Sequence, residues 1–185
     1  MNVYDFDQTI FYSDSSFKFT LYCLRHYPRC VLPALPKSLW PAAEYLAGSE
    51  DVKKLKEQIF SFLSRLPDVE QIVEDFWAEN SGLIQDWYLR QKRPDDLIIS
   101  ASPAFLLGPI ARKLGVTVIA TNMDPYTGRI YGRNCHDTEK VRRFREQYPD
   151  ALVEQFYSDS LSDAPMAGLA QQAFLVKRDE IVPWP

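Results

Sequence analysis

Two carboxylates separated by one residue stand near the start of the sequence, where an apolar run gives way to polar residues. Asp5 and Asp7 follow Val3-Tyr4 and precede Gln8-Thr9, a pattern typical of a buried strand that opens into a loop. The carboxyl edge of an α/β sheet is where ligands bind, and a carboxylate pair there can hold a metal ion and move protons. Because residues i and i+2 of a strand point the same way, a surface strand with two outward acids is the alternative interpretation.

Further polar groups stand at predicted strand ends or helix starts later in the chain: Ser100 with Ser102, Lys140, and Asp159 with Asp163. The carboxyl ends of parallel strands share one edge, so these groups can converge with the first two acids. Clustered carboxylates repel one another and raise each other's pKa. A Mg²⁺ ion and the Lys140 ammonium would relieve that repulsion and admit a dianionic phosphate, as in phosphoryl-transfer sites.

Hydrophobic periodicity predicts the elements that position these groups. A helix is expected from about Ser13 to Tyr27, because Ser13 and Asp14 offer N-cap side chains and Pro28 ends it. Helical stripes then dominate from Glu50 to Arg93. Strands are predicted at 96–103, 116–120, 155–159 and 173–176, helices at 103–114, 137–148 and 164–170, and a hairpin turn at 124–128.

This alternation of strands and helices predicts an α/β fold with a Rossmann-like, mainly parallel sheet and helices on both faces. About eighty residues separate the first two strands, too many for a plain crossover. We therefore predict an α-helical cap inserted after the first strand. The expected division is a catalytic core of residues 1–12 and 95–185 and a cap subdomain of residues 13–94. The aromatic residues of the cap are expected to form its core.

Composition restricts the class of protein. With 185 residues, the chain is long enough for one core and a modest second lobe. It has 46% hydrophobic and 25% charged residues, which is typical of a soluble globular protein. A net charge of −4 argues against a general nucleic-acid binder, which needs a basic surface. Three cysteines, an odd number, and the lack of a secretory apolar segment favour a reducing cytoplasm.

Cys23, His26 and Cys30 have helical spacing, so a zinc site has to be considered. Zinc requires four ligands in tetrahedral reach, and this spacing, interrupted by Pro28, matches no common zinc pattern. Cys23 is instead expected to pack as a small hydrophobic residue.

The apolar stretch of residues 31–46 is too short, and too interrupted by prolines and Lys37, to span a membrane. A buried or interfacial connection is the simplest interpretation. A helix dipping into a membrane surface from about Leu39 to Leu46 is the alternative, because Trp40 and Tyr45 would suit an interface.

In series, these groups resemble the four motifs of the haloacid dehalogenase superfamily of phosphotransferases. Asp5-Phe6-Asp7-Gln8-Thr9 matches its Asp-x-Asp-x-Thr signature, Ile98-Ile99-Ser100 its second motif, Lys140 its third and Asp159-x-x-x-Asp163 its fourth. The resemblance covers nearly the whole chain, and the helical insert is similar to the small cap of the phosphoserine-phosphatase-like branch, subfamily IB. Gln8 departs from the glycine of many members, and residues 160–162 from the glycine-rich run of phosphoserine phosphatase.

The resemblance implies a Mg²⁺-dependent phosphatase that hydrolyses a small phosphate monoester through an aspartyl-phosphate. Asp5 would be the nucleophile, and Asp7 would protonate the leaving oxygen and then activate water. Magnesium would be held by Asp5, the Asp7 main-chain carbonyl and Asp159, with Asp163 ligating through water or orienting Lys140. Substrate oxygens would be held by Ser100, Ser102 and Lys140.

Three rival functions remain open. A dehalogenase of the same superfamily would not need a proton carrier at Asp7. A non-catalytic metal-binding or scaffold member would show no turnover. A lipid-phosphate phosphatase at the membrane surface would use the apolar stretch of residues 31–46.

The substrate is not defined by these motifs. In small-cap members the insert closes over the leaving group, so the cap residues that qualify as contacts are Ser13, Asp14, Phe17, Tyr22 and Arg25. Ser13 and Asp14 also fit a plain helix cap. No obvious Glu/Arg pair is present to read the charged ends of an amino acid, so phosphoserine is not the expected substrate. The oligomeric state stays open.

Overall fold

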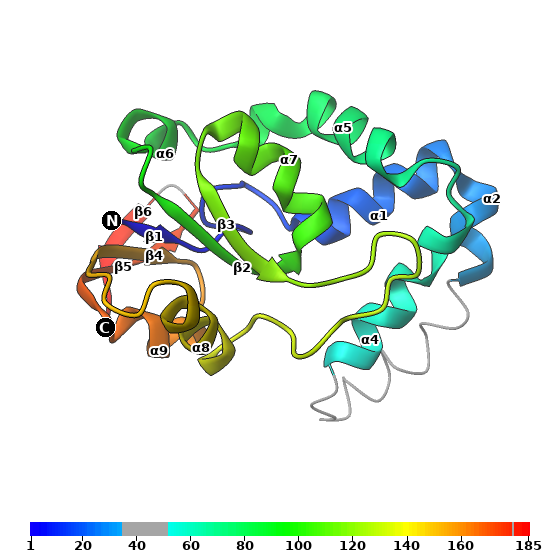
Figure 1. Cartoon of the computed structure of the whole chain (residues 1–185). Coiled ribbons are helices and arrows are strands. Elements are labelled where there is room, and N and C mark those ends of the chain that lie inside the picture. Colours follow the sequence, from blue (N-terminus) through cyan, green and yellow to red (C-terminus); the bar gives the residue numbers. More distant parts are fainter. Residues whose placement is uncertain (35–51, 179) are drawn as a thin grey trace.

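One mixed sheet organises the part of the chain described in this computed structural model, which is residues 1–34, 52–178 and 180–185 (Figure 1). Its strand order is β3-β2-β1-β4-β5-β6. The strands are β1 (Val3–Tyr4), β2 (Leu97–Pro103), β3 (Thr117–Thr121), β4 (Val153–Ser158), β5 (Ala170–Lys177) and β6 (Glu180–Pro183). Strands β1 to β5 are parallel, and β6 pairs antiparallel with β5. The predicted α/β fold with a mainly parallel sheet is confirmed.

Strand β1 lies at the centre of this sheet although it has only two residues. Val3 pairs with Leu97 of β2 and with Phe156 of β4. The buried apolar sequence of β2 is what a strand covered on both faces requires. Because β1 ends at Tyr4, Asp5 follows at its carboxyl end, and the Asp5 amide still donates to the Tyr157 carbonyl at 2.8 Å.

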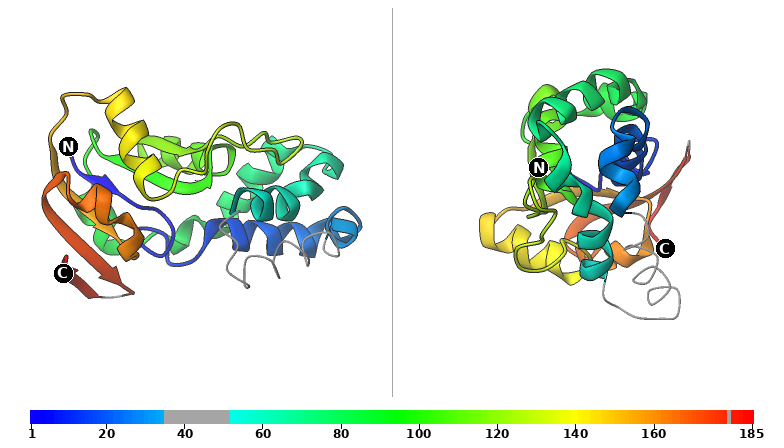
Figure 2. Two further views of the ribbon diagram at one scale, coloured as in Figure 1. Left: turned by 90° about the horizontal axis from the view of Figure 1, so that it is seen from below. Right: turned by 90° about the vertical axis from the view of Figure 1, so that its right-hand side faces the viewer.

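Helices cover both faces of the sheet and extend beyond it to one side (Figures 1 and 2). The α-helices are α1 (Ser15–His26), α2 (Pro28–Val31), α4 (Val52–Ile59), α5 (Val69–Asn80), α6 (Asp86–Gln91), α7 (Ala104–Leu114), α8 (Thr138–Gln147) and α9 (Ala164–Ala167). Short 3-10 helices are η1 (Leu32–Ala34), η2 (Phe60–Arg65), η3 (Ser81–Leu83) and η4 (Leu161–Asp163).

Three helix ends lie where their capping residues predict them. The Asp14 side chain accepts from the Phe17 amide at 2.7 Å and begins α1, and Asp68 does the same for Gln71 at 3.0 Å in α5. Gly115 ends α7 in a left-handed conformation with φ of 72°. The hairpin turn at 124–128 is also confirmed, since the Gly128 amide donates to the Asp124 carbonyl at 2.9 Å.

Two apolar clusters lie on opposite faces of the sheet. One contains Tyr4 with α7 and the helices that follow β1, and the other contains Val3 with α8 and α9. Consecutive residues of β1 point to opposite faces, so this short strand joins both clusters. Aromatic residues of the predicted cap pack in the first cluster, as expected: Phe19 and Trp77 each contact the Phe76 ring edge to face.

Several predicted boundaries are wrong. The helix predicted for 164–170 ends at Ala167, because β5 begins at Ala170, where it pairs with Val153 of β4. The helical stripe that begins near Leu55 tightens into 3-10 helix from Phe60. Strand β6 was not predicted; it contains Pro183, which is tolerated because β6 lies at the edge of the sheet.

The start of the apolar stretch, predicted as a connection, forms the helical turns α2 and η1. The alternative membrane-dipping helix at 39–46 falls outside the described residues. Among those that are described, no helix is long and apolar enough to cross a bilayer.

Cys23 is fully buried in the first apolar cluster, as predicted for a small hydrophobic residue. Burial raises the pKa of its thiol to about 12, so the thiolate that a metal would need is disfavoured.

The hairpin turn packs closely against η2, which generates a stability prediction. A Cβ at Gly128, where φ is +73°, would lie 2.6 Å from the Phe60 carbonyl oxygen. Gly128→Ala should therefore lower the free energy of unfolding in urea by about 2–4 kcal/mol, combining left-handed strain with a forced backbone shift. The control is Gly132→Ala, where φ is +78° and nothing lies within 4 Å; it should lose only about 1–2 kcal/mol. Equal losses would contradict this packing.

Candidate active site

A buried lysine bonded to two carboxylates forms the centre of the site. The Nζ atom of Lys140, in the first turn of α8, donates to Asp5 Oδ1 at 2.6 Å and to Asp163 Oδ2 at 2.7 Å. The Lys140 side chain is only 2% exposed. Burial alone would lower the pKa of its ammonium, but the two carboxylates outweigh burial and raise that pKa above its usual value. The lysine is therefore charged, and it joins the ends of β1, β4 and the start of α8.

Asp163 has one carboxylate oxygen that is satisfied and one that is not. Its Oδ2 atom also accepts from Ser158 Oγ at 2.7 Å. Its Oδ1 atom is buried and has no hydrogen-bond partner among the described residues. Since buried carboxylate oxygens are nearly always paired with a donor or cation, this atom indicates that a water or a cation belongs beside Asp163.

The Asp5 carboxyl lies in an environment with too little positive charge. Burial raises its pKa to about 8, with Lys140 opposing this shift and Asp163 adding to it. A cation beside Asp5 in addition to Lys140 would favour the ionised form of its carboxyl.

The oxygen atoms at this edge fit a hard divalent cation. Asp5 and Asp159 follow the adjacent strands β1 and β4, and Asp159 is half-buried with a pKa raised mainly by burial. Within the described ranges, no group of three or more His, Cys, Asp or Glu side chains is arranged to hold a metal ion. Main-chain oxygen and water would have to complete the coordination, which is how Mg²⁺ is usually bound.

Asp7 is held by groups different from those that hold Asp5. Its Oδ1 accepts from the Ser15 amide at 2.7 Å, and its Oδ2 accepts from Ser102 Oγ at 2.5 Å. Burial, and to a smaller extent Asp14, raise the pKa of Asp7 to about 6 although the bonds from Ser102 and Ser15 oppose the rise. A carboxyl with such a pKa can both give and take a proton near neutral pH.

The loop between the two acids and the helices is fixed by Thr9 and Gln8. Thr9 is fully buried, and its Oγ1 accepts from the Asp159 amide at 2.9 Å, which ties the first motif to the end of β4. Gln8 has a left-handed φ of 57°. Glycine adopts this conformation without strain, which accounts for the glycine of many family members, whereas this chain holds it with a non-glycine residue.

Ser100 and Ser102 have different partners. The Ser102 amide donates to Ser100 Oγ at 3.1 Å, so the Ser100 hydroxyl keeps its own proton for another acceptor. The Ser102 hydroxyl donates to Asp7 and accepts from Ser15 Oγ at 3.1 Å. Ser102 thus contacts the carboxyl of Asp7, a role that its position near the end of a strand did not predict.

The structure adds polar residues that the sequence did not identify. Lys56 Nζ, on α4, donates to the Ala101 carbonyl at 2.8 Å and to Asn134 Oδ1 at 2.9 Å. Thr121 Oγ1, at the end of β3, lies 2.8 Å from the same carbonyl and 3.0 Å from Asn134 Oδ1. A lysine on an amphipathic helix is normally solvent-exposed, so the sequence gave no reason to place Lys56 in the site. Of these residues, only Asn134 had a sequence signal, its position shortly before Lys140.

The predicted cap contacts separate into two groups. Ser13 and Asp14 line a cavity of about 680 Å³ together with Gln8 and Asp159, and Asp14 also caps α1 as expected. Phe17, Tyr22 and Arg25 instead line a different cavity of about 260 Å³ along α1, to which Ser13 also contributes. These three are not brought to the carboxylates.

Comparison with known proteins places the chain among related sequences. A model of the haloacid dehalogenase-like hydrolase family matches residues 3–168. Protein CicA of Caulobacter vibrioides (strain NA1000 / CB15N) is 31% identical over 90 residues, covering 45% of this chain and 40% of that protein. The chain thus spans about two-fifths of the length of the curated relatives it matches.

Solved structures share the fold over almost the whole chain. A protein of unknown function from Bordetella pertussis Tohama I has a TM-score of 0.77 and 22% identity, covering 94% of this chain and 87% of that chain. A phosphoserine phosphohydrolase-like protein from Francisella tularensis subsp. tularensis SCHU S4 has a TM-score of 0.55 and 16% identity, covering 94% and 86%. A probable phosphoserine phosphatase from Vibrio cholerae has a TM-score of 0.63 and 12% identity, covering 93% and 55%.

Glu139, next to Lys140, fixes the start of α8. It accepts from Arg142 Nη2 and Arg143 Nε, each at 2.8 Å, and Arg143 also donates to the Ala120 carbonyl at 2.7 Å. Hydrogen bonds from Arg142 are the main cause that lowers the pKa of Glu139 to about 2. Arg143 therefore links the helix that carries Lys140 to the end of β3, because it bonds both Glu139 and the Ala120 carbonyl.

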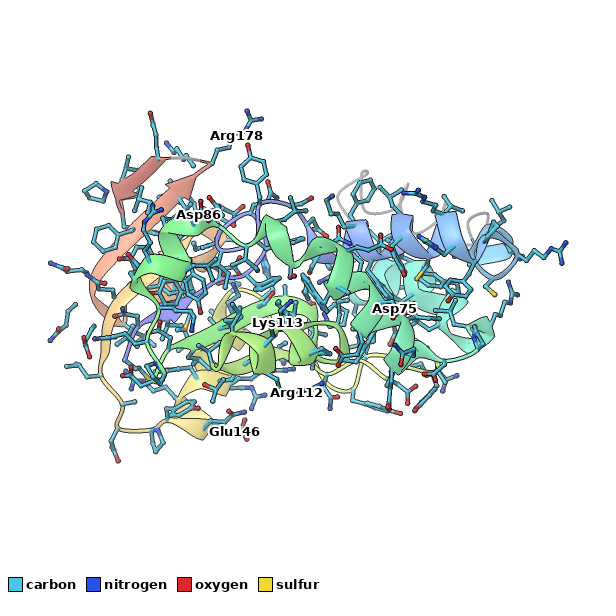
Figure 3. The ribbon with its side chains drawn as sticks, turned by 90° about the horizontal axis from the view of Figure 1, so that it is seen from above. Asp75, Asp86, Arg112, Lys113, Glu146 and Arg178 are labelled. Atoms are coloured by element: carbon cyan, nitrogen blue, oxygen red, sulfur yellow. The ribbon has the colours of Figure 1, made fainter. Side chains whose placement is uncertain are left out.

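This lowered pKa predicts a pH-dependent contribution to stability. A depressed carboxyl pKa stabilises the fold above the unfolded value of 4.5, and that stabilisation is lost as the pH falls toward 2. Glu139→Gln should cost about 1–3 kcal/mol of unfolding free energy at pH 7 and clearly less at pH 3. Glu146, at the outer edge of α8 (Figure 3), is the control, because its side chain is 66% exposed. Glu146→Gln should cost less than about 0.5 kcal/mol. A Glu139→Gln cost independent of pH would contradict the ion pair.

Proposed function

The chain belongs to the haloacid dehalogenase-like hydrolase family, and from that premise we propose that it is a Mg²⁺-dependent phosphatase acting on a small phosphate monoester through an aspartyl-phosphate. One observation carries the proposal: the buried Lys140 ammonium bonds Asp5 and Asp163 while Asp7 is held separately two residues after Asp5. This arrangement provides a nucleophile, a proton carrier and a cation for the phosphate in one place.

In the first half-reaction, an Asp5 carboxylate oxygen attacks phosphorus and the bond to the ester oxygen breaks. Asp7 gives its proton to that leaving oxygen, so the alcohol departs neutral. Ser100 Oγ and Lys140 Nζ donate to the transferring oxygens and stabilise their charge. The raised pKa of Asp7, about 6, suits this role because a useful fraction is protonated near neutral pH.

In the second half-reaction, the Asp7 carboxylate takes a proton from a water molecule. The resulting hydroxide attacks phosphorus, the bond to the Asp5 oxygen breaks, and inorganic phosphate leaves with Asp5 restored as a carboxylate. The hydrogen bonds from Ser102 Oγ and the Ser15 amide keep the Asp7 carboxyl oriented through both steps.

Magnesium would be held by the Asp5 carboxylate, the Asp7 main-chain carbonyl and Asp159. When bound, it would neutralise phosphate charge and keep Asp5 ionised. Asp163, whose Oδ1 atom has no hydrogen-bond partner among the described residues, would orient Lys140 and contact a metal-bound water.

We also propose the division into a core of residues 1–12 and 95–185 and a helical cap of residues 13–94. Support comes from Lys56 and Ser15, which lie in the helical part and reach the Ala101 carbonyl and Asp7. The cavity of about 680 Å³ beside Asp159 has room for a small leaving group. Cytoplasmic location belongs to the same proposal, and the three cysteines, all free, suit a reducing compartment.

A second candidate is a lipid-phosphate phosphatase at a membrane surface, and an exposed apolar set on the first helices favours it. Phe17 is 61% exposed, Leu21 46% and Leu32 53%, and the basic residues Lys18 and Arg25 lie along the same helix. Flotation with vesicles containing an anionic lipid tests it: recovery with the vesicles supports it, and recovery entirely in the soluble fraction contradicts it.

The nucleophile assignment is tested with p-nitrophenyl phosphate, an ester with an activated leaving group. The wild type should turn it over with Mg²⁺ and lose that activity with EDTA. Asp5→Asn keeps the shape of the side chain but removes the attacking charge, so kcat should fall about 10³-fold or more. Asp150→Asn, at an exposed position, is the control and should match the wild type. Full activity in Asp5→Asn would refute the nucleophile, and no wild-type turnover of any phosphorylated metabolite would favour a scaffold.

A further inference from the structure

A lysine outside the four motifs reaches into the site from the helical part of the chain. Lys56 lies on α4, and its ammonium is half-buried between two oxygen acceptors, the Ala101 carbonyl at 2.8 Å and Asn134 Oδ1 at 2.9 Å. Among the described residues, these bonds link α4 to both the last part of β2 and the segment before Lys140.

The Ala101 carbonyl belongs to the Ala101–Ser102 peptide, whose orientation affects the hydroxyl groups of Ser100 and Ser102. On the other side of that peptide bond, the Ser102 amide donates to Ser100 Oγ at 3.1 Å. The Ser102 side chain then donates to Asp7 Oδ2. Because a peptide unit is planar, a donor that fixes its carbonyl also fixes the direction of its N–H. Lys56 is therefore linked to Ser100 through the Ala101–Ser102 peptide, and to Asp7 through that peptide and the Ser102 side chain.

Lys56 holds the Ala101 carbonyl with a short hydrogen bond of 2.8 Å in a partly desolvated place. Burial lowers the pKa of its ammonium, whereas Asp7 and Asp14 favour the charged form and Lys140 disfavours it. Thr121 Oγ1 lies 2.8 Å from the same carbonyl, so the oxygen keeps a neighbouring donor if Lys56 is removed.

We propose that Lys56 is a positioning residue: by holding the Ala101–Ser102 peptide from α4, it sets the orientation of the Ser100 hydroxyl and, through Ser102, of the Asp7 carboxyl. This inference rests on the proposed phosphatase function, and it adds a dependence of that chemistry on a helix that carries none of the four motifs. Lys56 does not touch the reacting atoms in this account.

Lys53 offers a matched control on the same helix. One turn before Lys56, its Nζ donates to the Gly132 carbonyl at 3.1 Å, in the segment before Asn134 and not to the Ala101 carbonyl. Lys53→Met and Lys56→Met remove the same charge from the same helix and keep a side chain of similar length. Only the second removes a donor to Ala101.

Turnover of p-nitrophenyl phosphate at saturating Mg²⁺ separates the two variants. Lys56→Met should reduce kcat about 10- to 100-fold, the usual effect of a small misplacement of reacting groups, with KM changed by less than about threefold. Lys53→Met should match the wild type. Lys56→Arg, which keeps a cation and its donors, should recover part of the lost kcat.

A double-mutant cycle tests the route through Ser102. Ser102→Ala removes the bond to Asp7, so Lys56→Met should reduce kcat by a smaller factor in that background than in the wild type. Strict additivity would place the effect of Lys56 elsewhere and overturn the proposed route.

The amide signals of Ser100 and Ser102 in ¹H–¹⁵N spectra, recorded without substrate or Mg²⁺, give a readout independent of turnover. Both signals should shift in Lys56→Met and stay in place in Lys53→Met. If the wild type turns over no phosphate ester but these shifts occur, the phosphatase proposal fails while the positioning contact stands. If the wild type is active and Lys56→Met matches it in kcat, the inference is overturned, whatever the spectra show.

Discussion

A buried ammonium bonded to two carboxylates is the interaction on which the rest of the structure depends. Lys140 and Asp5 are 135 residues apart in sequence, yet their atoms lie 2.6 Å apart. An isolated charge of either sign could not be buried here, because desolvation of an unpaired ion is very costly. Lys140, Asp5 and Asp163 must therefore be brought together for any one of them to be buried, and β1, β4, η4 and α8 supply the positions.

Lys140, Asp5 and Asp163 together carry more negative than positive charge when both carboxyls are ionised. Two carboxylates share one ammonium, one carboxylate oxygen of Asp163 has no partner among the described residues, and burial holds the pKa of Asp5 at about 8. A divalent cation would offset this negative charge, and its remaining positive charge would favour the binding of a phosphate dianion. The bonds from the Ser15 amide and the Ser102 hydroxyl form a second, separate set that holds Asp7 apart from Lys140, as its proposed role of proton carrier would require.

The parts of the site predictable from sequence are those at strand ends. Asp5, Ser100 and Asp159 each follow an apolar run, and the common edge of a parallel sheet brings such positions together. Lys56 could not be predicted, because its sequence context is that of a solvent-exposed helix and its acceptor is a main-chain carbonyl. The bond from Ser102 to Asp7 depends on the local path of the backbone within β2, where the register with β3 shifts between Ser100 and Pro103.

The same distinction applies to the fold. Caps such as Asp14, Asp68 and Gly115 are local signals, so the ends they set agree with the structure. Strand β6 forms because it pairs with β5, and α9 ends early because β5 begins at Ala170 to pair with β4. No local pattern encodes either pairing.

The central claim is that Asp5 receives a phosphoryl group beside Lys140, Ser100 and a magnesium ion. A crystal structure of the wild-type protein with Mg²⁺ and beryllium trifluoride, a mimic of a phosphoryl group on a carboxylate, tests it most directly. The account predicts beryllium bonded to an Asp5 carboxylate oxygen, with fluorine atoms accepting from Ser100 Oγ and Lys140 Nζ and Mg²⁺ on Asp5 and Asp159. Beryllium trifluoride bound to another residue, or Mg²⁺ bound away from Asp5 and Asp159, would contradict it.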